Sequence, residues 1–336
     1  MIAMLELFLM PMPRTYICQY VETPPVIDGR ANDWSGLPWT EEFIDIEGTD
    51  VPPLRTRAKM CWDDEAIYFM AEMVEPHLWA TYTERDSVIF HENDFEVFLN
   101  PSGDSHTYYE FEMNALNTVW DLLLRRPYKD GGSADNDWTI KGLRTAVHLD
   151  GTLNDPSDVD RGWTVEIAMP FKAFDIHTDT PGAPNPGDQW RINFSRVEWD
   201  LEVVDGVYRK IKDRPEHNWV WSPQYVINMH KPEHWGYVQF SKGQHDTFIP
   251  DESRPARVTL QKIYEAQRLH HKAHDSWATT FAELGLDPGR DLATPTAIGD
   301  PRLHAGDPWH ASVRIRTSKG EQEWTITHDA RVFRSK

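Results

Sequence analysis

The sequence has few cysteines, a shortage of basic residues and no long apolar run, and each shortage excludes a class of protein. Its two cysteines, Cys18 and Cys61, cannot build a disulfide framework and lie in no CxxC pair, which favours a reducing compartment. No stretch approaches the roughly 20 apolar residues of a membrane-spanning helix. Lys and Arg total 34 against 54 Asp and Glu, a net charge of −20. This charge disfavours nucleic acid and anionic membranes as partners.

Recognisable catalytic motifs and a signal peptide are also missing. The chain has no HExxH, P-loop or GxSxG, and no GxGxxG between a strand and a helix. The start, MIAMLELFLMPMP, is apolar but contains Glu6 and lacks both a basic n-region and a small-residue cleavage site. We therefore predict a cytoplasmic protein. An alternative is that translation begins at Met12, and a secreted form then stays open.

Aromatic residues and proline, by contrast, are abundant, with 15 Trp and 24 Pro. Twelve of the tryptophans fall between Trp34 and Trp235, among short runs of alternating apolar residues separated by turn formers. The fold class predicted is mainly β, an antiparallel, jelly-roll-like β-sandwich. The predicted strands are Ala58–Trp62, Ala66–Met73, Phe95–Asn100, Thr107–Asn114, Trp120–Leu124, Leu143–Leu149, Trp163–Met169, Trp190–Trp199 and Trp235–Phe240.

The composition changes near residue 246. From Asp246 onward 13 acidic residues balance 13 basic ones, so residues 1–245 carry the whole net charge. Ala256–Leu284 has helical spacing, and two alternating runs flank Ser318–Gly320 as in a hairpin. We therefore divide the chain into an N-terminal extension (1–22), a β-sandwich (23–243) and a small C-terminal α+β appendage of helix plus hairpin (250–336).

Two predicted strands place acidic side chains on one face. In TYYEFEMN (107–114) and ENDFEVFLN (92–100) the apolar residues take odd numbers, so a hairpin that buries both sets aligns the even ones. This pairs Glu96 with Glu110 or Glu112. The shared face then carries Asp94, Glu96, Glu110, Glu112 and Asn114. It is either a solvated outer face or a site that needs oxygen atoms.

Later runs favour a site, although each tryptophan taken alone is more typical of a core. WRINFSRVEW places Arg191, Asn193, Ser195 and Trp199 on one side, and HNWVWSP places Trp219 and Trp221 on a common face. Carboxylates, amides and flat rings together suit a sugar, whose hydroxyls bond to oxygen and nitrogen atoms while its C–H face lies on an aromatic ring.

The chain resembles the carbohydrate-binding module family 9-like domains over about residues 23–241. The similar segments, in order, are PPVIDGRANDW, AKMCWDDEAIYFMAEMVEP, NDFEVFLNP, GWTVEIAMPF, WRINFSRVEW and PEHWGYVQF. The resemblance implies a β-sandwich with a sugar site on one sheet, commonly for glucose- or xylose-type ends. Structural calcium is also common in the family, and acids in WDDE (62–65) and NDPSDVD (154–160) are its candidate ligands.

The resemblance also assigns residues. It implies that Glu96 is the contacting carboxylate, that Phe90 takes a stacking position, and that Ser195 replaces a glutamine. Asn114 matches an asparagine, but the arginine two residues before it is Glu112 here, which argues against reducing-end glucose specificity. A second stacking tryptophan falls near Met229, where Trp219 or Trp221 could substitute. The predicted contact set is Phe90, Glu96, Glu110, Glu112, Asn114, Arg191, Ser195, Trp199, Trp219 and Trp221.

The predicted function is carbohydrate binding in glycan utilisation, with a mono- or oligosaccharide partner, no required cofactor, and structural calcium as a candidate. The first alternative is a glycoside hydrolase using Glu96 and Glu112, since directly paired strand residues have Cβ atoms about 4.5–5.5 Å apart and retaining glycosidases hold two carboxyl groups about 5–5.5 Å apart. The second is an acidic module that binds a cationic protein.

Overall fold

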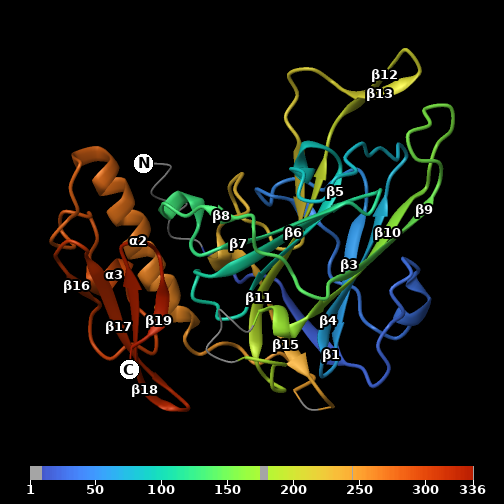
Figure 1. The fold of residues 1–336 in the computed structure, drawn as a ribbon. Helices are drawn as coiled ribbons and strands as arrows, with labels where there is room; N and C mark the ends of the chain where they lie inside the picture. Colours follow the sequence, from blue (N-terminus) through green and yellow to red (C-terminus); the bar gives the residue numbers. More distant parts are fainter. Residues whose placement is uncertain (1–9, 175–180, 244, 336) are drawn as a thin grey trace.

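The computed structural model describes residues 10–174, 181–243 and 245–335, which form a large curled β-sheet and a smaller helix-and-sheet unit beside it (Figure 1). The described strands of the large sheet are β1 (Thr15–Tyr20), β2 (Ile44–Asp45), β3 (Thr56–Trp62), β4 (Ala66–Val74), β5 (Asp94–Asn100), β6 (Tyr108–Asn114), β7 (Val119–Leu124), β8 (Ala134–Asp135), β9 (Arg144–Asp150), β10 (Gly162–Pro170), β11 (Gln189–Glu198), β14 (His217–Val220) and β15 (Gly236–Ser241). All nine predicted strands are present, so the mainly β prediction is confirmed.

The sheet runs in the order β8-β7-β6-β5-β11-β15-β1-β3-β4-β10-β9, with β14 paired to β11 and β2 paired to β14. Its pairings are antiparallel except at β1, which runs parallel to both β15 and β3. Residues 15–20, expected to belong to an N-terminal extension, thus lie in the middle of the sheet. The physical reason is burial: Tyr16 and Cys18 alternate into the core and are 5% and 0% exposed.

The main core lies inside the curled sheet, because every second residue of the strands on its two facing halves points inward. Phe194 of β11 contacts Phe95 of β5 and Phe69 of β4, with ring centroids 5.7 Å apart in both pairs. The opposite faces of β5, β6 and β11 are therefore outside this core, and they carry the acidic residues.

A separate hairpin, β12 (Leu201–Val204) and β13 (Val207–Lys210), projects from the sandwich at the end of β11 (Figure 1). Its two-residue turn is Asp205-Gly206, and both residues have positive φ. This is the turn that matches the natural twist of paired strands.

The C-terminal unit has its own small core. It contains α2 (Arg254–His274), α3 (Pro288–Asp291), β16 (Arg302–His304), β17 (His310–Thr317), β18 (Gly320–Thr327) and β19 (Val332–Arg334). The hairpin around Ser318–Gly320 is confirmed. The predicted helix was too long at its end, because Asp275 adopts a left-handed conformation and stops α2. No helix in the described part of the chain is long and apolar enough to cross a membrane.

Candidate functional site

The acidic face forms with the predicted parity. Glu96 lies opposite Glu112, and Asp94 lies opposite Asn114. Glu110 follows on the same face of β6, opposite Phe98. On the other side of β5, Ser195 of β11 pairs with Glu96.

This face is not solvated, so the interpretation as an outer acidic surface is wrong. Asp94, Glu96, Glu110 and Glu112 are 0%, 4%, 6% and 1% exposed. Chain segments distant in sequence cover the face. Trp235, just before β15, packs 5.5 Å from the ring of Phe98 and 5.2 Å from that of Tyr108 on the same side of the sheet.

The buried carboxylates have no cationic partner. None of the four forms an ion pair with a Lys, Arg or His within the described residues. Burial, followed by repulsion from neighbouring carboxylates, holds the pKa values of Asp94, Glu110 and Glu112 well above the usual range. Burial raises the pKa of Glu96 to about 7. The cluster therefore resists carrying its full negative charge unless a ligand supplies compensation.

Asn114 is occupied by internal hydrogen bonds. Its Nδ2 donates to the carbonyl of Tyr82 (2.9 Å) and to Glu92 Oε1 (2.6 Å), while its Oδ1 accepts from the backbone N–H groups of Leu116 and Thr118, both at 3.0 Å. All its bonding capacity in the plane of the amide is used within the fold. The structure therefore corrects its assignment as a sugar contact: this side chain fixes the turn after β6.

Aromatic rings border the cluster. Phe90 is half-buried, and its backbone N–H donates to Glu112 Oε2 at 3.0 Å. The ring of Phe90 stacks with that of Trp120, 6.4 Å away, and Trp120 is the β7 partner of Glu112. Trp120 is absent from the predicted contact set, although extending the alternation of β6 to the next strand places it on this face.

Arg191 and Trp221 lie away from the cluster. The Arg191 guanidinium stacks on Tyr237, 3.7 Å from the ring centroid, and its Nη2 donates to the carbonyl of Glu233 at 2.7 Å. Trp221 is fully buried in the main core, next to Phe194. Neither residue is positioned for the predicted sugar contact, because strand parity and burial turn both side chains to other surroundings.

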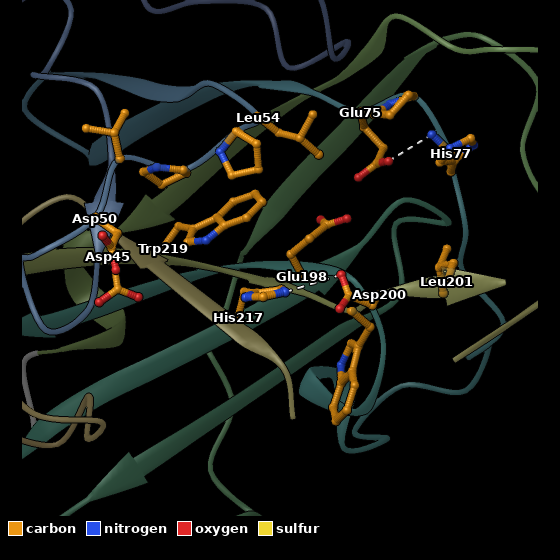
Figure 2. A pocket seen from close by; sticks show the side chains of 15 residues that line it. Asp45, Asp50, Leu54, Glu75, His77, Glu198, Asp200, Leu201, His217 and Trp219 are labelled. Atoms are coloured by element: carbon orange, nitrogen blue, oxygen red, sulfur yellow. Dashed lines mark hydrogen bonds and ion pairs between the residues drawn. The ribbon is translucent and has the colours of Figure 1, made fainter. Parts of the chain in front are cut away.

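Trp199 and Trp219 instead line a cavity of about 390 Å³ between segments 45–54, 75–77, 198–201 and 217–219. Figure 2 shows Trp219 at its centre, Leu54 above it, Glu75 and His77 on one side, and His217 with Asp200 below. The lining residues are Asp45, Asp50, Val51, Pro52, Pro53, Leu54, Glu75, Pro76, His77, Glu198, Trp199, Asp200, Leu201, His217 and Trp219. We call this cavity the Trp219 pocket.

The pocket offers both donors and acceptors. The indole N–H of Trp219 has no acceptor among the described residues, and the His217 ring stacks on Trp219 with centroids 5.9 Å apart. His217 Nε2 lies 3.3 Å from Asp200 Oδ1. Hydrogen bonding from Arg214 lowers the pKa of Asp200 and keeps this carboxylate ionised. The pocket is therefore polar on one side and apolar along Pro52, Pro53 and Leu54.

A buried ion triad supports the pocket. Arg196 Nη2 lies 2.7 Å from Glu75 Oε2 and 2.9 Å from Glu198 Oε2. Its guanidinium also lies 5.0 Å from the ring centroid of Trp219. Asn93 donates to the remaining oxygen of Glu198 at 3.0 Å. These bonds hold the side chains of the pocket in place.

In the two loops considered for calcium, several acids already have partners within the protein. In 62–65, Asp63 accepts hydrogen bonds from two backbone N–H groups and from Tyr68, and Asp64 pairs with Lys242. In 154–160, Asp160 accepts from the backbone of Leu78 and Thr152. Across residues 10–174, 181–243 and 245–335, one group of three or more potential ligands lies close together, and it is Asp94, Glu96 and Glu112.

The fold is thus a curled β-sandwich with a pocket lined by aromatic, histidine and carboxylate side chains. Residues 27–240 match the model of the family described as "Carbohydrate family 9 binding domain-like", so this chain belongs to that family.

Relatives are similar over part of the chain. Exoglucanase XynX of Acetivibrio thermocellus is 27% identical over 183 residues, which are 54% of this chain and 13% of that protein. Endo-1,4-beta-xylanase A of Thermoanaerobacterium saccharolyticum is 27% identical over 149 residues, 44% of this chain and 11% of that protein. The chain thus spans about an eighth of the length of these curated relatives.

A solved structure is also similar: a carbohydrate binding module family 9 from Caldicellulosiruptor kristjanssonii in complex with cellotriose. Its TM-score is 0.45 at 18% identity, and the match covers 71% of this chain and 99% of that one.

Proposed function

We propose that the β-sandwich binds a neutral carbohydrate, and that the Trp219 pocket is its binding site. The observation that carries the proposal is the pocket itself, because it combines open volume with two indole rings, two histidines and several carboxyl groups. Pockets of roughly 300–1,000 Å³ are typical of small-molecule sites, and about 390 Å³ suits one or two sugar rings.

The chemistry of the pocket favours a polyhydroxyl ligand. Asp50 and Asp200 offer acceptors to sugar hydroxyls, and the N–H of Trp219 and the ring of His217 offer donors. Charge-assisted hydrogen bonds of this kind contribute about 1.5–3 kcal/mol each. The acids disfavour a uronic acid or a sugar phosphate. Since the named relatives are a glucanase and a xylanase, β-1,4-linked gluco- and xylo-oligosaccharides are the first ligands to test.

Titration calorimetry with these oligosaccharides tests the proposal. His217→Ala and Asp50→Asn change exposed pocket side chains and should weaken binding by roughly ten-fold each, with little change in melting temperature. Trp120→Ala is the matched control, because Trp120 lies beside the acidic face and outside the pocket. If Trp120→Ala abolishes binding while His217→Ala does not, the sugar lies over Phe90 and Trp120, and the assignment to the pocket is wrong.

Two further readouts separate the other functions. Carbohydrate binding through hydrogen bonds should change little between low and high salt, whereas a cationic protein partner would dissociate as salt rises. The unmodified protein should leave aryl glycosides intact. Turnover lost in Glu112→Gln would instead support the hydrolase alternative with Glu96 and Glu112.

A further inference from the structure

Three buried carboxylates converge beside β5 and β6. One oxygen from each of Asp94, Glu96 and Glu112 lies within 4.8 Å of the other two. These side chains are 0%, 4% and 1% exposed, and Glu110 adds a fourth buried carboxylate to the same face. We call Asp94, Glu96 and Glu112 the carboxylate triad. It shares no residue with the Trp219 pocket.

The triad lacks the neutralisation that buried acids in proteins normally have. Elsewhere in the same fold, buried Glu75 and Glu198 pair with Arg196. No described basic side chain reaches the triad in this way. Buried carboxylates without a counter-charge must gain a proton or a cation, because desolvation and mutual repulsion both oppose their ionised state.

An orphaned oxygen points to a missing partner. Asp94 Oδ1 accepts from the backbone N–H of Val197 at 3.2 Å, but its buried Oδ2 has no hydrogen-bond partner in the described structure. Ser195 is fully buried and pairs with Glu96 across β5 and β11. Burial raises the pKa of the Glu96 carboxyl group and hydrogen bonding from the Ser195 hydroxyl lowers it, so this oxygen already faces the triad. Buried polar atoms almost always have partners, so the orphaned oxygen of Asp94 among three converging carboxylates indicates a ligand there.

We propose that the carboxylate triad binds a hard divalent cation, with Asp94, Glu96 and Glu112 as ligands and Ser195 as an additional oxygen donor. The donors are all oxygen atoms, with no histidine or cysteine among them, which suits Ca²⁺, Mg²⁺ or Mn²⁺ and not Zn²⁺ or copper. Three carboxylates that can each bind through one or two oxygens approach the six to eight ligands that Ca²⁺ prefers. Because its ligands come from β5, β6 and β11, the cation links these three strands at a position next to the rings of Phe90 and Trp120.

Terbium luminescence tests the site, because Tb³⁺ replaces Ca²⁺ and is excited by a nearby indole. Trp120 is the β7 partner of Glu112, and directly paired residues have Cβ atoms about 5 Å apart. The full chain, freed of metal by chelation, should sensitise Tb³⁺ emission on excitation at 280 nm, and Ca²⁺ should displace the Tb³⁺. Trp120→Phe should lower the emission and still bind Ca²⁺ in calorimetry, while Trp199, whose indole N–H bonds to the Phe90 carbonyl, supplies the remaining emission. Emission that this substitution leaves unchanged would place the ion elsewhere and overturn the assignment.

Glu112→Gln provides the second test, with Asp158→Asn in the acidic loop at 154–160 as its control. In chelator the Glu112→Gln variant should melt no lower than the wild type, because it removes a repelling charge and keeps an oxygen for the Phe90 N–H. Ca²⁺ should raise the melting temperature of the wild type and of Asp158→Asn, but not that of Glu112→Gln. If neither calorimetry nor melting detects Ca²⁺, Mg²⁺ or Mn²⁺ on the folded wild type, shared protons neutralise the triad and the proposal is wrong.

Discussion

At the scale of single residues, strand parity could be predicted from sequence but burial could not. The alternation in 92–100 and 107–114 is enough to place Glu96 opposite Glu112. Nothing local indicates that Trp235, more than 100 residues later, covers the same face. For that reason the acidic residues were open to interpretation as a solvated surface. Trp120 lies on the next strand, β7, so the parity of 92–100 and 107–114 alone does not assign it to the site.

Asn114→Ala should destabilise the fold, because Asn114 bonds to Tyr82, Glu92, Leu116 and Thr118 and all of these groups lose a partner together. Each buried group left unsatisfied costs about 1–3 kcal/mol. We expect the free energy of unfolding in urea to fall by at least about 2 kcal/mol.

The matched control is Asn32→Ala, since Asn32 is exposed and should change stability little. An Asn114→Ala variant that keeps wild-type stability but loses sugar binding would restore the sequence-based assignment of Asn114 as a contact residue.

At the scale of elements, antiparallel strands with clear alternation were predictable, and exceptions have physical causes. The parallel strand β1 follows an apolar segment, so its six-residue alternation does not stand out from the sequence before it. Helix α2 ends at Asp275 although the apolar spacing continues through Trp277 and Phe281. These two rings still pack against the C-terminal core, but from a turn-rich segment. Beyond residue 274, spacing therefore predicted burial correctly and the helix incorrectly, whereas α2 itself confirms the predicted helix from Ala256 onward.

The Arg196 triad should be the strongest polar link between β11 and the end of β4. Besides Glu75 and Glu198, Arg196 donates to the carbonyl of Val74 at 2.9 Å and to Thr56 Oγ1 at 3.1 Å. Arg196→Met leaves two buried carboxylates unpaired, and breaking a buried ion pair in this way typically costs about 3–5 kcal/mol. We expect a loss of this size in urea denaturation.

Arg55→Met is the control for this comparison, because the Arg55–Glu72 pair is partly exposed to solvent, and exposed pairs contribute about 0–1 kcal/mol. Similar losses for the two variants would show that the buried triad adds no more stability than a surface ion pair.

At the scale of the whole molecule, the charge shift near residue 246 coincides with a change of core. The main core draws its buried residues from 16 to 240, and the C-terminal core draws its own from 256 to 332. The two units meet largely through polar contacts. Arg268 and Tyr264 of α2 both bond to Asp130, and Arg331 pairs with Asp104. The family match likewise ends at residue 240.

A chain ending at Gly243 should therefore fold by itself. Truncation exposes Asp104, Asp130 and Glu233, which water can solvate, and it removes the hydrogen bonds that buried Gln239 makes to residues 245–249. It removes no residue of the main core or of the Trp219 pocket. We expect the near-ultraviolet circular dichroism per sandwich tryptophan to be unchanged. The melting temperature should fall by a few degrees, because the hydrogen bonds and ion pairs from α2 are lost. The sugar affinity should stay within two-fold of that of the full chain. Arg268→Ala in the full chain removes the ion pair with Asp130 and leaves the C-terminal unit in place. It should lower the melting temperature by less than truncation does. If the shortened chain is insoluble while Arg268→Ala is stable, the C-terminal unit completes the sandwich fold, and the division at residue 243 is wrong.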